Sequence, residues 1–375
     1  MIKVMTILGT RPEIIRLSRI IPKLDENFDH TLVHTGQNYD YSLNKVFFDD
    51  LGLREPDIFL EAACDSPIKT ISLILEKIDL SFEAIKPDAV LILGDTNSSL
   101  VAIPAKRKKI PIFHMEAGNR CFDFRVPEEI NRRIVDVISD VNLTYSKIAR
   151  QYLIDEGFSK NRVINTGSPM KEVLDFYTKK IKSSKILKTL NLKKNNFFLV
   201  SIHREENLDY EKRFERIPEI LNGLSERFSI PVIVSTHPRA RKKIESSNLN
   251  FDKNIHFSDP FSFTDYCNLQ INSRCVLSDS GTISEESSIL NFPAINLRIF
   301  HERPEGTEEA SVISVGLNLN NIFNAIRITD NQLKGENRNL KIVDDYDVDN
   351  VSEKISRIIL GTIDLVRQDV WRENQ

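Results

Sequence analysis

The chain has 375 residues, of which 41% are hydrophobic and 28% charged, and its formal net charge is −3. That length allows two domains with hydrophobic cores, and the composition is ordinary for a soluble globular protein. The charge balance gives no reason to expect nucleic acid or an anionic membrane as a partner. No stretch approaches the run of about 18 apolar residues that a membrane span needs.

The N-terminal segment, the cysteines and the histidines bear on cellular location and metal binding. Residues 1–8 are too short for the apolar region of a signal peptide and lack a small-residue cleavage site, so we expect a first strand there. The cysteines show no CxxC spacing, which favours reduced thiols in the cytoplasm; they are Cys64, Cys121, Cys267 and Cys275. Neither His203 nor His237 has a histidine four residues away, so no metal site is expected.

Short apolar segments alternate with helical patterns through residues 1–170, which we expect to form the first domain. Strands are predicted at 2–8, 30–34, 89–93, 110–115, 141–144 and 163–165. Helices are predicted at 14–24, 41–51, 68–85, 99–109 and from 127 to about 140. This alternation indicates a parallel, doubly wound sheet. The strand at 89–93 is wholly apolar, as strands buried on both faces tend to be.

Residues 171–196 are polar and basic and interrupt this rhythm, so we expect a connector between domains. The pattern then restarts over 197–350, with strands at 197–202, 231–235, 275–278 and 294–297 and helices at 211–227 and 283–290. The last segment, 351–375, is predicted to be a helix to about 360 with a further segment to 371. Two α/β domains of similar size imply a cleft, with ligands at the carboxyl ends of the strands.

Polar loops follow the predicted strands at six places: 9–13, 94–96, 114–118, 203–206, 236–239 and 278–286. One such loop means little, because polar caps are common where strands end. Six of them favour an enzyme with a cleft, or a nucleotide-binding protein. The sequence contains no Walker A motif and no G-x-G-x-x-G fingerprint, so neither motif supports nucleotide binding here.

Residues 114–132 contain many charges of both signs for a connector between a strand and a helix. Pro127 suits a first helical position, and Glu128 and Arg132 are four residues apart on one helix face. One interpretation is a capped helix with an exposed ion pair. The other is that Glu116 and Glu128 face a substrate. This stretch alone leaves both open.

The turn at 280–282 precedes a predicted helix and can aim backbone N–H groups at an anion such as a diphosphate. A plain serine N-cap at Ser280 is the alternative. Glu286 is placed to accept hydrogen bonds from a ribose or sugar hydroxyl. Arg11, at the exit of the first strand, is a candidate to neutralise the diphosphate.

Taken in order, these loops resemble the non-hydrolysing UDP-N-acetylglucosamine 2-epimerase family. The matching segments are 9–13, 94–96, 114–118, 127–132, 203–205, 280–286 and 302–305. The resemblance implies two Rossmann-like domains facing a cleft, as in GT-B glycosyltransferases, with the helix of 351–375 packing back on the first domain. It also implies a UDP-N-acetyl-sugar substrate, a homodimer, and chemistry that needs no cofactor.

The resemblance implies a mechanism as well. The family breaks the anomeric C–O bond and removes the C2 proton, which gives UDP and a 2-acetamidoglycal, and then adds UDP back with a proton on the other face. The catalytic residues implied are Asp95, Glu116, Glu128 and His203. The implied substrate-binding residues are Arg11, Arg16, Arg132, His237, Ser280, Gly281, Thr282, Glu286 and Arg303, with Arg16 at the family's usual lysine position.

Three departures from many bacterial members concern the sugar. The segment 118–126 is about two residues shorter, Asn38 stands where members with an allosteric site have histidine, and 280–284 reads Ser-Gly-Thr-Ile-Ser. These features resemble the branch that interconverts UDP-2-acetamido-2,6-dideoxy-L-talose and UDP-N-acetyl-L-fucosamine for capsule or O-antigen. Phe122, Phe124 and Val126 are candidates to contact a 6-deoxy sugar. UDP-GlcNAc epimerisation, a hydrolysing epimerase, a GT-B transferase and a non-catalytic UDP-sugar binder are the alternatives.

Overall fold

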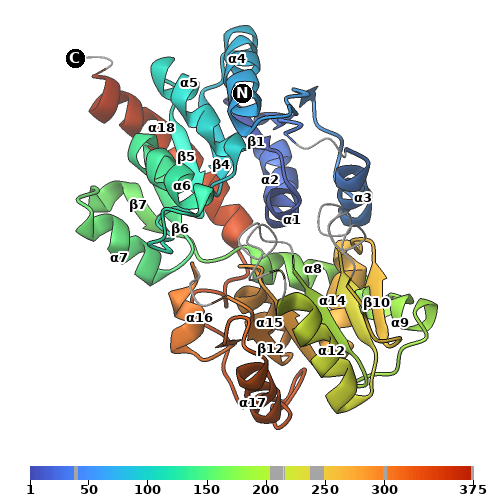
Figure 1. Cartoon of the computed structure of the whole chain (residues 1–375). Helices are drawn as coiled ribbons and strands as arrows, with labels where there is room; N and C mark the ends of the chain where they lie inside the picture. The colour runs from blue at the N-terminus through green and yellow to red at the C-terminus, as the bar shows by residue number, and fades with distance from the viewer. Residues whose placement is uncertain (38–40, 203–213, 215, 237–248, 299–301, 373–375) are drawn as a thin grey trace. The chain divides into compact units, whose positions relative to one another are not determined.

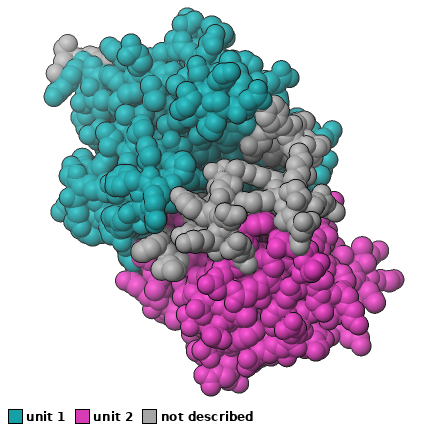
Figure 2. Space-filling view, viewed as in Figure 1, with its two compact units in different colours: residues 1–176, 345–375 teal, residues 177–344 magenta. Residues whose placement is uncertain are grey.

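The structure, a computed structural model, describes residues 1–37, 41–202, 214, 216–236, 249–298 and 302–372. The chain divides into two compact units: unit 1 comprises residues 1–176 and 345–375, and unit 2 comprises 177–344 (Figure 2). The segment expected as a connector, 171–196, is largely helical, with α8 (Met170–Ser183) and α9 (Ile186–Thr189). In the described part of the chain, no helix is long and apolar enough to cross a membrane.

Unit 1 is built on a seven-stranded sheet. Its strands are β1 (Lys3–Leu8), β2 (Asp29–His34), β3 (Ile58–Phe59), β4 (Ala89–Leu93), β5 (Ile112–Met115), β6 (Val141–Thr144) and β7 (Val163–Asn165). They lie in the order β3-β2-β1-β4-β5-β6-β7, and every neighbouring pair is parallel. The order reverses between β1 and β4, the place where open α/β sheets bind their ligands.

Most helices of unit 1 lie where the sequence predicts them, but α7 was not predicted, the helix predicted at 99–109 is a 3-10 turn followed by the shorter α5, and two further predictions need correction. They are α1 (Arg11–Leu17), α2 (Ile20–Asn27), α3 (Tyr41–Leu51), α4 (Pro67–Ile85), α5 (Ala102–Arg107), α6 (Pro127–Ile138), α7 (Lys147–Asp155) and α18 (Val351–Trp371), with 3-10 turns η1 (Asn97–Val101) and η2 (Lys160–Arg162). The single helix predicted at 14–24 is wrong: it is split, which leaves Pro22 in the first turn of α2, where its missing N–H is tolerated. The C-terminal segment is one continuous helix, α18, which belongs to unit 1 and packs against α2 (Figure 1).

Both faces of the unit 1 sheet are covered. On one face Met5, Ile7 and Ile92 join a buried cluster with Ile78 and Phe82 of α4. Side chains alternate along a strand, so Val4 and Leu91 point to the opposite face, and they are as completely buried. Fully burying side chains of this size contributes roughly 1.5–3 kcal/mol each. The sheet is therefore a rigid support for the loops at its carboxyl edge.

Unit 2 is built on a six-stranded sheet of the same kind. Its strands are β8 (Phe198–Ser201), β9 (Val232–Ser235), β10 (Ile255–Ser258), β11 (Cys275–Ser278), β12 (Ala294–Asn296) and β13 (Ile313–Ser314). The order is β10-β9-β8-β11-β12-β13, again with every pair parallel. The described helices include α12 (Arg216–Phe228), α14 (Phe263–Asn272), α15 (Ile283–Leu290), α16 (Pro304–Glu308) and α17 (Leu319–Thr329).

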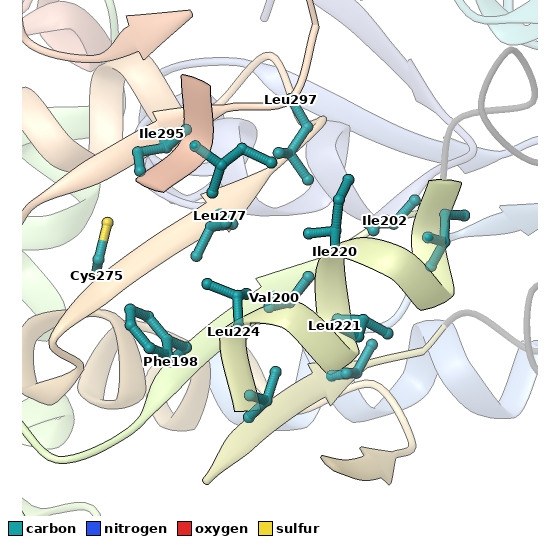
Figure 3. Close-up of a cluster of buried hydrophobic side chains, with 14 of the residues drawn as sticks. Phe198, Val200, Ile202, Ile220, Leu221, Leu224, Cys275, Leu277, Ile295 and Leu297 are labelled. Atoms are coloured by element: carbon teal, nitrogen blue, oxygen red, sulfur yellow. The ribbon is translucent and has the colours of Figure 1, made fainter. Parts of the chain in front are cut away.

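The core of unit 2 lies on both faces of this sheet. Figure 3 shows one face, where Val200, Leu277 and Ile295 from three strands meet Ile220 and Leu224 of α12. On the other face a second cluster joins Leu199, Ile233 and Val276 to Leu269 of α14 and Ile283 of α15. The strand order reverses between β8 and β11, so the loop after β11 starts at the same topological position as the loop after β4 in unit 1.

Candidate active site

Close packing of backbone brings together the loops after β1, β2 and β4 in unit 1. The hydroxyls of Thr35 and Ser98 are hydrogen-bonded at 2.7 Å, directly beside Gly9. A Cβ at Gly9 would collide with both hydroxyls. Only glycine lets the chain pass here, which explains the glycine that opens the 9–13 motif.

Glu13 ties the loop after β1 to the loop after β4. Its Oε2 accepts hydrogen bonds from the backbone N–H groups of Gly9 and Thr10 at 2.6 and 2.7 Å, and its Oε1 accepts one from the Thr96 hydroxyl at 2.7 Å. Burial raises the pKa of this carboxyl to about 7, and the hydrogen bonds only partly offset that. No role was predicted for Glu13. The available signal was its place three residues after Thr10, which is typical of a capping box.

Asp95 and Arg132 form an ion pair between the loop after β4 and helix α6. Arg132 is buried, and it also donates hydrogen bonds to Glu129 at 2.9 Å and to the Asn119 carbonyl at 3.3 Å. The Asp95 side chain is 19% exposed. The interpretation of α6 as a capped helix with an exposed ion pair is therefore wrong, because Arg132 is held inside the unit with its charge matched.

Glu116 follows β5 and is held in a strained conformation. Its φ is +64°, in the left-handed region, which costs a non-glycine residue roughly 1–2 kcal/mol. The carboxylate is buried, forms an ion pair with Arg16 and accepts a hydrogen bond from the Asn119 amide at 3.3 Å. The loop after β4 lies alongside, since a Cβ at Gly94 would sit 3.6 Å from Glu116 Oε2. Two carboxylates, each paired with an arginine, thus follow neighbouring strands.

The remaining predicted residues of unit 1 lie nearby in sequence but differ in exposure. Glu128, in the first turn of α6, is partly buried, whereas its neighbour Glu129 is fully buried. Glu129 accepts hydrogen bonds from the Cys121 backbone at 3.0 Å and from Arg132, so it braces the loop. Arg11 is partly exposed at the start of α1, with its guanidinium 5.6 Å from the centre of the Phe47 ring.

The loop after β11 in unit 2 offers hydroxyls and backbone donors instead of ion pairs. Ser280 Oγ accepts a hydrogen bond from the Thr282 backbone N–H at 3.3 Å and lies 3.1 Å from the Thr282 hydroxyl. The Ser280 N–H donates to Ser278 Oγ at 3.0 Å. The residue before α15 is Thr282, whose side chain makes no capping bond, so Ser280 braces the turn without being a standard N-cap.

Glu286 and Arg303 are both buried in unit 2. Glu286, on α15, accepts a hydrogen bond from Gln270 Nε2 at 2.5 Å. Arg303 forms an ion pair with Glu285 at 3.1 Å, and neighbouring Arg298 and Glu302 pair at 3.0 Å. These buried pairs fix the segments around α15 and α16.

Two predicted site residues, His203 and His237, lie outside the described residues, as does Asn38. In unit 1 the structure brings together four predicted site residues: Arg16, Asp95, Glu116 and Arg132. In unit 2 it places four more on the loop after β11 and on α15: Ser280, Gly281, Thr282 and Glu286. Across the described ranges, no group of three or more histidine, cysteine or acidic side chains could hold a metal ion.

Comparison with known proteins gives consistent results. A family model described as UDP-N-acetylglucosamine 2-epimerase matches residues 22–360. The UDP-N-acetylglucosamine 2-epimerase of Methanocaldococcus jannaschii is 35% identical over 341 residues, 87% of this chain and 92% of that protein. The UDP-2,3-diacetamido-2,3-dideoxy-D-glucuronate 2-epimerase of Pseudomonas aeruginosa is 32% identical over 322 residues, 84% of this chain and 87% of that protein.

Solved structures agree with this. A UDP-N-acetylglucosamine 2-epimerase from Rickettsia bellii is 49% identical, with a TM-score of 0.94 and complete coverage of both chains. The Methanocaldococcus jannaschii enzyme, solved in complex with UDP-GlcNAc and UDP, is 34% identical with a TM-score of 0.89, covering 96% of this chain and all of that one. The predicted fold class, two doubly wound parallel-sheet domains of the GT-B kind, is confirmed.

Proposed function

The chain belongs to the UDP-N-acetylglucosamine 2-epimerase family, a family of non-hydrolysing isomerases, and from this premise we propose how it works. It inverts C2 of a UDP-bound 2-acetamido sugar by eliminating UDP to a 2-acetamidoglycal and adding UDP back. One observation carries the proposal: two carboxylate–arginine pairs, Asp95 with Arg132 and Glu116 with Arg16, follow neighbouring strands of unit 1.

The chemistry needs such groups. A C2–H bond is a weak acid, and inversion requires proton donors and acceptors on both faces of the sugar ring. We assign this work to Asp95, Glu116 and Glu128. His203, the fourth proposed catalytic group, is assigned to the sugar and the departing diphosphate and not to proton transfer at C2. Arg16 and Arg132 supply positive charge beside these carboxylates, where a departing diphosphate accumulates negative charge. No step calls for a metal or a redox cofactor.

Unit 2 supplies the proposed nucleotide site. The turn of Ser280, Gly281 and Thr282 presents hydroxyls and backbone N–H groups that suit a diphosphate. Glu286, buried on α15 beside this turn, is the proposed acceptor for a ribose or sugar hydroxyl. The set also includes Arg11, His237 and Arg303, which rest on the resemblance because Arg303 pairs with Glu285 and His237 lies outside the described residues.

The proposed sugar is the 6-deoxy pair, UDP-2-acetamido-2,6-dideoxy-L-talose and UDP-N-acetyl-L-fucosamine, made for capsule or O-antigen. The support is the shortened segment 118–126 and its exposed aromatics: Phe122 and Phe124 are 62% and 64% exposed. Either ring has apolar surface to offer a methyl group. Val126 is buried in the fold, which argues against a direct contact from that residue. A cytoplasmic location and a homodimer are part of the same proposal.

UDP-GlcNAc is the second candidate sugar. It is favoured by the names of the relatives, since the structure at 49% identity is called a UDP-N-acetylglucosamine 2-epimerase. The Pseudomonas relative, named for a different UDP-sugar, indicates that the family accommodates more than one sugar. The two candidates share the mechanism and differ only in the group at C6 and in the ring configuration.

The test is to incubate the protein with UDP-N-acetyl-L-fucosamine and, separately, with UDP-GlcNAc, and to follow new anomeric signals by proton NMR. The C2 epimer of the first substrate alone supports the 6-deoxy sugar. Epimerisation of UDP-GlcNAc alone contradicts that assignment and leaves the mechanism intact. Free N-acetylmannosamine would indicate a hydrolysing enzyme, and binding without turnover of either sugar would indicate a sensor or a transferase.

A further inference from the structure

We propose that Asp136, on α6, is a positioning residue that sets the geometry of the loops carrying Asp95 and Glu116. The inference rests on the proposed function, because those two carboxylates are its assumed proton carriers. Asp136 itself is fully buried at the base of both loops, so it acts through the backbone and never through contact with substrate.

The first part of the evidence is the set of donors around Asp136. Its two oxygens accept the Gly118 backbone N–H at 3.2 Å each, and Oδ2 accepts a hydrogen bond from Arg120 Nη1 at 2.6 Å. Its Oδ1 lies 3.0 Å from Nδ1 of the buried His114 ring. Burial opposes ionisation of this carboxyl, yet His114 and Arg120 outweigh it and lower the pKa of Asp136 below its usual value.

The second part is the path from Asp136 to the loop that carries Asp95. His114 Nε2 lies 2.8 Å from the carbonyl oxygen of Gly94, the residue directly before Asp95. A carbonyl only accepts, so Nε2 carries a proton and donates it. The Gly94 N–H in turn donates to the Met115 carbonyl at 2.9 Å. The position of Gly94, and with it the start of the Asp95 loop, is thus fixed through His114.

The third part is the path from Asp136 to Glu116. Glu116 holds a positive φ of 64°, a conformation that persists only where the surroundings enforce it. Two residues later Gly118, at φ +78°, is held by Asp136, and a Cβ there would lie 2.5 Å from the Ala149 carbonyl. Arg120, bound to the same carboxylate, also donates to the Asn119 carbonyl at 2.8 Å. One side chain therefore anchors both loops.

Asp140 provides a matched control. It is also buried, and it lies beside the same strand, β5, but at the opposite end. Its carboxylate accepts the Ile112 backbone N–H at 3.0 Å and pairs with Lys106. Each aspartate therefore lies at one end of β5, where its carboxylate binds one backbone N–H group and one cationic side chain. A purely structural role predicts similar consequences for replacing either of them.

The experiment compares Asp136→Asn with Asp140→Asn in the full-length protein. The asparagine amide turns one acceptor of Asp136 into a donor, which can then face the Gly118 N–H or the Arg120 guanidinium, both of them donors. We expect Asp136→Asn to lower kcat per UDP-binding site about 100-fold, since an error of about 1 Å in placing a catalytic group has that cost. KM is expected to change less than threefold, and the isotope effect with C2-deuterated substrate to rise. Asp140→Asn is expected to lower the thermal midpoint while leaving these three quantities unchanged.

Counting sites by calorimetric UDP binding separates misfolding from misplacement, because a structural defect removes sites without slowing those that remain. An unchanged kcat per site in Asp136→Asn overturns the inference, as does an equal loss in Asp140→Asn. If Asp136→Asn does not fold, His114→Gln is measured instead: it keeps a donor for Gly94 but loses the link to Asp136, and an unchanged kcat per site there overturns the inference too. A wild-type protein that epimerises neither sugar defeats the proposed function, and this inference falls with it.

Discussion

The two units share a strand order and differ in what their loops present. In unit 1 the loops after β4 and β5 hold carboxylates paired with arginines, Asp95 with Arg132 and Glu116 with Arg16. In unit 2 the loop after β11 holds hydroxyls and backbone donors around Ser280 and Thr282. The same topology thus places a polar loop at the carboxyl edge of each sheet, and the side chains of that loop decide the chemistry. We expect proton transfer from the first unit and anion binding from the second.

The strongest way to break this comparison is to remove a carboxylate from unit 1. We expect Glu116→Gln to lower kcat about 10³-fold, because general acid–base catalysis contributes roughly 10²–10⁴-fold. UDP affinity is expected to change far less than kcat, since the turn at 280–282 and Glu286, to which we assign most of the UDP binding, belong to unit 2. Steady-state kinetics and calorimetric titration with UDP measure the two quantities.

Asp95→Asn and Glu128→Gln are expected to behave in the same way. A variant that keeps the full rate removes its residue from the mechanism. A variant that loses UDP affinity together with activity contradicts the division of labour between the units.

The second prediction concerns two buried glutamates. Glu285 in unit 2 has Arg303 at 3.1 Å, whereas the described hydrogen-bond partners of Glu13 in unit 1 are neutral, and the pKa of Glu13 is raised from 4.5 to about 7. The folded state therefore holds its proton more tightly than the unfolded state, and stability falls as pH rises between about 4.5 and 7. At higher pH the full cost, up to about 3 kcal/mol, is present.

Glu13→Gln removes this titration. We expect the variant to gain stability relative to wild type as pH rises from 5 to 8, as measured by urea midpoints at both values. A difference in stability that stays the same at the two pH values would falsify the account of Glu13.

The third prediction sharpens the sugar assignment. If Phe124 packs on the methyl group of a 6-deoxy sugar, Phe124→Ala raises KM for that substrate about tenfold, since a contact of this size is worth roughly 1–3 kcal/mol. Val137→Ala serves as the control, because Val137 is also an exposed apolar residue, on α6. Equal effects of the two substitutions on KM would count against a sugar contact by Phe124.

The smallest expected effect is in unit 2. Removing one hydroxyl in Ser280→Ala loses a hydrogen bond of about 1 kcal/mol, so KM is expected to rise about fivefold with kcat unchanged. Ser262→Ala is the control, since the Ser262 hydroxyl caps α14 by accepting the Asp265 N–H at 3.2 Å. A fall in kcat for Ser280→Ala would place unit 2 in the proton-transfer chemistry and blur the comparison.

Much of the fold could be predicted because apolar strands such as β4 alternate with helices of clear period. The edge strands β3 and β13, of two residues each, carry too little pattern to be recognised. The break between α1 and α2 was missed although Pro22 signalled it. The spacing of apolar residues identifies a segment as helical, but it locates the ends of the helix less well.

The candidate site divides in a similar way. Asp95 and Glu116 stand in recognisable motifs after strands, and Arg132 stands in the motif that opens α6, so the sequence pointed to all three. Glu13 and Asp136 did not stand out, because their importance comes from partners such as Thr96, 83 residues away from Glu13. A usable signal for Asp136 was a polar stripe on α6, since Glu129, Arg132 and Asp136 recur at helical spacing and are all buried.

The most direct test of the central claim, that unit 1 removes and returns the C2 proton, is incubation in D2O with C2 followed by proton NMR. The account predicts that deuterium enters C2 of whichever UDP-sugar is accepted, as its epimer appears, and that Glu116→Gln slows this exchange about 10³-fold while still binding UDP. Epimer formed with hydrogen retained at C2, or exchange undiminished in Glu116→Gln, would contradict it.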